Sequence, residues 1–159
     1  MAQRSRLSAG LSGVAGEYFV AAELSRQGYI ASITLRNTRG IDILASAGDA
    51  SKSVGIQVKT NQSSGKEWML NQKISDEDQA ESKNLFYVFV RLNGMEIPEY
   101  YIVPRKEVIK FASENHKRWL ETPGRKGQAH VDTPMRKFSD PDNKYKDRWD
   151  LLGLGAPAS

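Results

Sequence analysis

The sequence has no cysteine, only two histidines and no long apolar run. Without cysteine, the chain forms no disulfide, zinc–thiolate centre, iron–sulfur cluster or thiol nucleophile. No stretch approaches the roughly 20 apolar residues that cross a bilayer. The polar start at residues 1–6 leads into no apolar segment of the kind that secretory signals contain. We therefore expect a cytoplasmic protein that makes no contact with a membrane.

Hydrophobic patterning predicts a single α/β domain. The 159 residues are 39% hydrophobic, which suffices for one core. Apolar residues recur with helical spacing before Gly28, with Ser12 as the expected cap, and a second helix is expected after Pro104. The expected helices span residues 11–27 and 105–119, and the expected strands span 29–35, 41–45, 54–60, 67–70, 85–90 and 100–103. This order predicts a central mixed sheet of about five strands flanked by helices.

Composition divides the chain into five parts. Residues 1–9 are polar and are expected to be flexible. Residues 10–119 form the α/β domain. Residues 120–148 are rich in proline, glycine and basic residues and are expected to be irregular, whereas the apolar side chains of 149–154 are expected to dock on the domain. Residues 155–159 are expected to be a disordered tail.

Positive charge is concentrated in the C-terminal part of the chain. There are 23 Lys and Arg against 19 Asp and Glu, and the excess lies between Lys117 and Arg148. A basic segment on a neutral body fits a polyanionic partner such as DNA, and a solvated loop of mixed charge is the alternative. The candidate nucleic-acid contacts are Arg125, Lys126, Arg136, Lys137, Lys144 and Lys146.

Four polar side chains occur where the pattern otherwise predicts buried elements. Glu17 is in the first helix, Asp42 interrupts a short apolar strand, and Gln57 and Lys59 project from the same face of a further strand. A carboxylate within a strand is costly unless it is paired or binds a metal. If the two strands are neighbours, Asp42, Gln57, the Val58 carbonyl and Glu17 offer the oxygen ligands that Mg²⁺ prefers. Lys59 would orient a water and offset negative charge on phosphorus, which favours hydrolysis of a phosphodiester.

Three motifs carry a resemblance to a known family: Gly16-Glu17, Gly40-Ile41-Asp42 and Ile56-Gln57-Val58-Lys59-Thr60. Over residues 10–103 the chain resembles the PD-(D/E)xK nuclease superfamily, in particular archaeal Holliday-junction resolvases and Mrr-like restriction endonucleases. The resemblance implies a restriction-endonuclease-like fold and an endonuclease that cleaves DNA with Mg²⁺, or alternatively Mn²⁺. It also implies that Glu17 and Asp42 bind the metal, that Gln57 takes the place of the second acid, and that Lys59 is the catalytic lysine.

Two departures from the family pattern leave other functions open. Ile41 stands where the motif has proline, and Gln57 stands where it has Asp or Glu, which removes one negative charge from the metal site. The alternatives are a catalytically inactive nucleic-acid-binding module on the same fold, or a scaffold for protein interactions. Cleavage of two strands would favour a homodimer.

Each site residue also has a purely structural interpretation. Asp42 and Lys59 then form only a cross-strand salt bridge, Glu17 is an exposed helix charge, and Gln57 bonds to a neighbouring loop. The two histidines are expected at the surface without a role in the site. The tryptophans either stack on bases or pack in the core; they are Trp68, Trp119 and Trp149.

Overall fold

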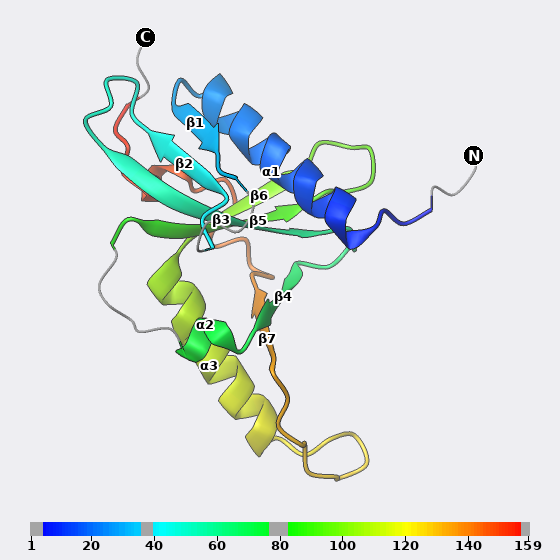
Figure 1. Cartoon of the computed structure of the whole chain (residues 1–159). Helices are drawn as coiled ribbons and strands as arrows, with labels where there is room; N and C mark the ends of the chain where they lie inside the picture. Colours follow the sequence, from blue (N-terminus) through cyan, green and yellow to red (C-terminus); the bar gives the residue numbers. More distant parts are fainter. Residues whose placement is uncertain (1–4, 36–39, 77–82, 157–159) are drawn as a thin grey trace.

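The computed structural model describes residues 5–35, 40–76 and 83–156 (Figure 1). Three α-helices and one 3₁₀ helix accompany seven strands in these ranges. The helices are α1 (Ala9–Arg26), α2 (Lys73–Asp76), α3 (Arg105–Glu121) and η1 (Trp149–Leu152). The strands are β1 (Ile30–Ile33), β2 (Ile43–Ser46), β3 (Ser53–Asn61), β4 (Glu67–Asn71), β5 (Leu85–Arg91), β6 (Glu99–Pro104) and β7 (Met135–Ser139). No helix in the described ranges is both long and apolar enough to span a bilayer.

The central sheet is mixed and has five strands, in the order β1-β2-β3-β5-β6. Only β3 and β5 run parallel, and the other neighbours are antiparallel. The unbroken apolar run Phe86–Val90 is buried throughout, as expected for a strand with neighbours on both sides and cover on both faces. The predicted mixed five-stranded sheet is therefore confirmed.

Two apolar clusters pack on opposite faces of this sheet, because successive side chains of β5 point to opposite sides. Val88 belongs to the cluster under α1, and Phe89 belongs to the cluster under α3. The first cluster includes Val20, Leu24, Ile56, Leu152 and Leu154. The second includes Trp68, Tyr87, Val108, Ala112 and Phe138.

The start of α1 differs from the prediction. Ser8 caps the helix, and its side-chain oxygen accepts a hydrogen bond from the Leu11 N–H. Ser12, the predicted cap, lies inside α1, is buried, and donates from its hydroxyl to the Ala9 carbonyl. The prediction was wrong because the small residues before Ser12 accept a helical conformation and extend α1 by about one turn. The predicted end is close, since α1 stops at Arg26 and Gly28 has a φ of 87°.

Gly16 brings α1 unusually close to β3. A Cβ at this position would overlap the Thr60 hydroxyl and would lie 3.0 Å from Thr60 Cβ and 3.2 Å from its methyl group. Only glycine fits this contact without displacement of the helix or the strand. The turn of α1 that carries Glu17 is thereby fixed against the strand that carries Lys59.

Helix α3 and the ribbon formed by β4 and β7 project from the sheet as an arm, which we define as residues 67–76 and 105–139 (Figure 1). Phe138 of β7 stacks on Phe89 of the sheet at 4.4 Å between ring centroids and contacts Phe111 of α3 at 5.1 Å. The strand β7 lies in the stretch that was predicted to be irregular. The sequence does not reveal it, because its pairing partner β4 lies more than 60 residues earlier.

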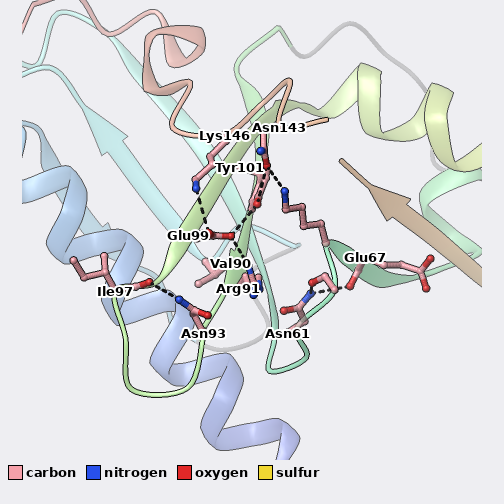
Figure 2. A network of polar contacts seen from close by, with 12 residues as sticks. Asn61, Glu67, Val90, Arg91, Asn93, Ile97, Glu99, Tyr101, Asn143 and Lys146 are labelled. Carbon is pink, nitrogen blue, oxygen red and sulfur yellow. Dashed lines mark hydrogen bonds and ion pairs between the residues drawn. The ribbon is translucent and has the colours of Figure 1, made fainter. Parts of the chain in front are cut away.

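A polar network joins the start of β6 to the C-terminal segment (Figure 2). Glu99 is its centre: its carboxylate accepts from Arg91 Nη1 at 2.9 Å, from the Tyr101 hydroxyl at 3.0 Å and from Lys146 Nζ at 3.1 Å. Asn143 accepts from Tyr101 and from Lys66. The network ties the chain after the arm back to the central sheet.

Glu99→Gln is expected to lower the free energy of unfolding at neutral pH by about 1–3 kcal/mol, because charge-assisted hydrogen bonds are lost. Burial alone would raise the pKa of Glu99, but the hydrogen bonds from Lys146, Arg91 and Tyr101 outweigh it and lower the pKa. A lowered folded-state pKa stabilises the protein above the unfolded pKa, and this contribution disappears as the pH falls through the folded value. Denaturant unfolding between neutral pH and pH values below the ordinary 4.5 should show a shallower loss of stability in the variant. Glu96→Gln, at an exposed position of the loop between β5 and β6, is the control, and its stability should depend on pH as that of the wild type does.

Candidate active site

Asp42 lies directly beyond the last pair of the β2–β3 ladder. That pair joins Ile43 to Ile56, and the Asp42 N–H donates to the Ile56 carbonyl at 2.8 Å. The β3 strand continues past this point without β2 beside it. Asp42 Oδ2 takes up the free position by accepting a hydrogen bond from the Val58 N–H at 2.7 Å. The carboxylate is therefore held against β3 at the end of its neighbour strand.

Gln57 and Lys59 project from β3 into a cleft with a volume of about 390 Å³. The register pairs Gln57 with Tyr87 on the β5 side, and Gln57 directly follows Ile56, whose carbonyl accepts from the Asp42 N–H. A Cβ at Gly40 would lie 3.5 Å from Gln57 Oε1, so the Gln57 amide lies against the backbone before Asp42. Gln57 and Lys59 thus share one cleft, and Asp42 is fixed beside Val58 between them, whereas neither Asp42 nor Glu17 is among the described residues that line the cleft. The roles of all four residues stay predictions.

Positive charge dominates the lining of this cleft. Its cations are Lys59 of β3, Lys73 of α2 and Arg105, the first residue of α3. None of the lining residues within 5–35, 40–76 and 83–156 carries a carboxylate. The peptide dipoles at the start of α3 add partial positive charge near Arg105. Sequence reasoning missed Lys73 and Arg105, because only the packing of α2 and α3 beside the sheet brings them to the cleft. The arrangement favours an anionic ligand such as a phosphodiester.

Tyr87 forms part of the cleft and was also missed, because its apolar run indicates core. Burial, and to a smaller extent the negative charge of Asp42, raise the pKa of Tyr87 to about 12. Tyr87 therefore remains a neutral phenol at physiological pH.

The structure decides two of the structural interpretations. Among the ion pairs of the described residues there is none between Asp42 and Lys59, so the simple salt bridge is wrong. No hydrogen bond of the Gln57 side chain to a loop occurs among the described contacts either. Glu17 is half-buried on α1, next to the Gly16 contact with Thr60, and its role as a metal ligand stays a prediction.

Three oxygen donors near the end of β2 would be the ones to hold a divalent cation. Asp42 retains Oδ1 beyond its bond to Val58, Gln57 offers an amide oxygen, and the Val58 carbonyl lies past the β2–β3 ladder. No group of three or more His, Asp or Glu side chains gathers among the residues that the structure describes. A cation at this place would have one carboxylate and neutral oxygens as its protein ligands, a set that Mg²⁺ accepts because this ion keeps several waters.

The six candidate nucleic-acid contacts fall into different environments. Arg125 and Lys126 are exposed in the loop after α3. Three of the lysines have local partners: Lys137 pairs with Glu67, Lys146 pairs with Glu99, and Lys144 lies over the Tyr145 ring. Arg136 is buried. The structure therefore leaves Arg125 and Lys126 as the most accessible members.

The aromatic candidates also separate. Trp68 is buried and donates its indole N–H to the Val90 carbonyl, and Trp149 packs on Tyr100. Trp119 alone of the three is exposed, and its ring stacks between His116 and His130. Packing thus accounts for Trp68 and Trp149. The two histidines, which were expected at the surface without a role, both pack on the Trp119 ring.

Comparison with known proteins identifies the fold. No protein-family model matches the chain, and no curated protein matches it. A bacterial homing endonuclease of known structure is similar over 95% of this chain and 96% of its own, with 15% sequence identity and a TM-score of 0.55. The Holliday junction resolvase Hjc of Archaeoglobus fulgidus matches over 90% of this chain and 88% of its own, with 12% identity and a TM-score of 0.48. The likeness to the homing endonuclease shows that the chain has a restriction-endonuclease-like fold, which confirms the fold that the sequence predicts.

Proposed function

We propose that this chain, which has the fold of the PD-(D/E)xK nucleases, is an endonuclease that hydrolyses DNA phosphodiester bonds with Mg²⁺ or Mn²⁺. One observation carries the proposal. Asp42 is fixed against β3 at the end of the β2–β3 ladder, and the next residues of β3 include Gln57 and Lys59, which line a cleft whose charged side chains, among the described residues, are all cations. This combination provides oxygen ligands for a metal and positive charge for a phosphate at the same place.

Each residue of the proposed site has a separate role. Asp42, Gln57 and the Val58 carbonyl hold the metal, with Glu17 as the further ligand. The metal supplies Lewis acidity and lowers the pKa of bound water. Lys59 orients the attacking water and stabilises negative charge that develops on the phosphoryl oxygens. Lys73 and Arg105 hold the phosphates of the strand in the cleft.

The proposal is tested by incubating the purified protein with linear and branched DNA in Mg²⁺, in Mn²⁺ and in chelator. Cleavage in either metal, absent in chelator, is expected. A homogeneous protein that binds both DNA forms but cleaves neither in any metal would refute the enzymatic assignment. Sedimentation in the presence and absence of DNA tests the expected homodimer in the same preparations.

Gln57 favours a second candidate, a nucleic-acid-binding module without activity. In the described residues, Asp42 is the carboxylate fixed beside β3, and the second acid of the motif is replaced. Such a module binds DNA through the cleft cations with a steep salt dependence, and it shows no metal-stimulated cleavage.

Gln57→Glu separates the two candidates. An added carboxylate on the strand that holds Asp42 should destabilise the metal-free protein by like-charge repulsion. It should raise the affinity for Mn²⁺ by on the order of tenfold, because ligand charge sets affinity in such sites. Thermal unfolding with and without Mn²⁺ measures both effects, since a bound ion raises the melting temperature. Gln72→Glu, exposed and outside the cleft, is the control. A gain of cleavage in Gln57→Glu over an inactive wild type identifies the binding module, and an unchanged response to Mn²⁺ contradicts a metal site at Gln57.

A further inference from the structure

A second groove lies on the arm, between the C-terminal half of α3 and β7, with a volume of about 430 Å³. Figure 1 shows these two elements side by side, away from the central sheet. The groove is lined by Asn115, His116 and Trp119 of α3, by Thr133, Met135, Arg136 and Lys137 in and before β7, and by one carboxylate, Glu67 of β4. None of these residues lines the cleft beside Lys59.

Arg136 is the unusual feature of this groove. The residue is only 8% exposed, and its Nη1 donates to the carbonyls of Thr133 at 2.7 Å and Met135 at 3.0 Å. These two bonds fix the guanidinium but use one of its three nitrogens. Among the described residues Arg136 has no carboxylate within ion-pair distance. A buried cation without a bonded anion is costly, so the groove is arranged for an anionic group.

The carboxylates near the groove are committed to other cations. Asp132 Oδ1 lies 2.8 Å from His116 Nε2, and Glu67 Oε1 lies 2.9 Å from Lys137 Nζ. The hydrogen bond from His116 is the main cause that lowers the pKa of Asp132, and the charge of Arg136 contributes less. The charge of Arg136 therefore acts on Asp132 without a direct contact, and none of the described carboxylates forms an ion pair with Arg136.

Two apolar side chains, Trp119 and Met135, also line the groove. Trp119 is 37% exposed, and its ring packs on His116 at 5.5 Å and on His130 at 4.2 Å between centroids. Met135 is 53% exposed. The exposed part of the Trp119 ring and the Met135 thioether offer apolar contact to a base or sugar, beside a buried guanidinium that suits a phosphate.

The surroundings attract the same ligand. Residues 115–137 contain six Lys and Arg and only two Asp and Glu. The exposed Arg125 and Lys126 lie in the loop that joins the two walls of the groove. Positive charge of this kind raises the local concentration of a nucleic-acid strand.

We propose that the groove between α3 and β7 binds one nucleotide of a nucleic-acid strand, with the phosphate on Arg136 and the base or sugar against Trp119 and Met135. The groove is separate from the cleft. This proposal rests on the proposed function in one respect, the choice of nucleic acid as the ligand. The arm then provides a second point of contact, which holds the strand while the cleft engages another part of it.

The three indole N–H signals of ¹⁵N-labelled protein provide a direct test. Inorganic phosphate, a nucleoside monophosphate and a short single-stranded oligonucleotide are titrated in turn, all in chelator so that no cleavage occurs. We expect the Trp119 signal to move with the monophosphate and the oligonucleotide. The Trp68 signal should stay in place, because this indole is buried and bonded to Val90. Replacement of each tryptophan by phenylalanine assigns the signals.

Matched substitutions locate the binding. Met135→Glu places a negative charge in the groove at an exposed position and should weaken oligonucleotide binding at least tenfold, by about 1.4 kcal/mol. Met69→Glu is the control, because Met69 is 45% exposed on the same ribbon and does not line the groove. Arg136→Gln should abolish the Trp119 shift, and its thermal unfolding establishes that the variant is folded.

The outcomes are distinguishable from failure of the proposed function. A Trp119 signal that does not move while the oligonucleotide binds would overturn the groove and leave the cleft untouched. If inorganic phosphate moves the Trp119 signal as far as the monophosphate does, the groove binds only an oxyanion, and the proposed nucleotide site is wrong. If the Trp119 signal shifts but the protein cleaves no DNA in any metal, the nucleotide-binding groove is supported and the proposed nuclease activity is refuted.

Discussion

Lys59→Ala is expected to lower kcat for DNA cleavage by roughly 10²- to 10³-fold, the loss typical for removal of one preorganised charge-stabilising donor. Lys59 projects from β3 into the cleft two residues after Gln57, and it forms no ion pair with Asp42 that would divert its charge. Its positive charge is therefore available for the phosphoryl oxygens, where negative charge grows in the transition state. The effect should fall on kcat more than on KM, because the interaction strengthens as the reaction proceeds.

Two further lysines provide the comparison. Lys73→Ala removes a cation from the same cleft at an exposed position, so it should raise KM and flatten the salt dependence while kcat changes little. Lys110→Ala removes an exposed cation of α3 that does not line the cleft, and its kinetics should match the wild type. Single-turnover cleavage at saturating DNA measures the chemical step. Equal losses of kcat in Lys59→Ala and Lys110→Ala would contradict a catalytic role for Lys59.

Asp42→Asn tests the other half of the same site. Asparagine retains an oxygen that accepts from the Val58 N–H, so the fold should be preserved, but the negative charge for the metal is lost. Cleavage should fall at least as far as in Lys59→Ala and recover partly at higher Mn²⁺ concentration. Recovery with Mn²⁺ in Asp42→Asn, without recovery in Lys59→Ala, distinguishes a metal ligand from a residue that acts on the phosphate.

Gly16→Ala is expected to destabilise the protein by about 1–3 kcal/mol, although alanine is the better helix former. The added Cβ would overlap the Thr60 hydroxyl, whose position is fixed in β3, so α1 or β3 must shift. A shift at this point displaces the turn with Glu17 from the strand with Lys59. Cleavage should therefore fall together with the free energy of unfolding, which chemical denaturation measures.

Gly13→Ala is the matched control in the same helix. No atom lies within 4 Å of a Cβ at Gly13, so only the gain in helix propensity remains, and we expect stabilisation by up to about 1 kcal/mol. Thr60→Ala should relieve part of the Gly16→Ala defect, since it removes the overlapping oxygen. By itself Thr60→Ala should lower the free energy of unfolding only slightly, because that oxygen is buried without a hydrogen bond. Opposite signs for the two glycines, with coupling between Gly16→Ala and Thr60→Ala, are the expected result. Equal effects at both glycines would contradict the close contact.

The local pattern of the sequence determined most of the central sheet. The apolar run that became β5 has no alternation, which indicates burial on both faces, and β5 has neighbours on both sides. Alternation in β3 placed Gln57 and Lys59 on one face, because the side-chain period of a strand is two. The short connection between β2 and β3 made them neighbours, and Asp42 followed as the residue beyond their last pair. These features are local, so a single sequence contains them.

Only the tertiary structure decided the remaining parts of the cleft and the arm. Lys73, Tyr87 and Arg105 reach the cleft from three elements, and no periodic pattern relates them to Lys59. The strand β7 exists because β4 offers it backbone partners from a distant part of the chain, and Arg136 is buried because that pairing turns it toward α3. The contact of Gly16 with Thr60 spans 44 residues. Contacts between distant segments form only when the whole chain is packed, since their stability comes from burial shared among elements rather than from local preference.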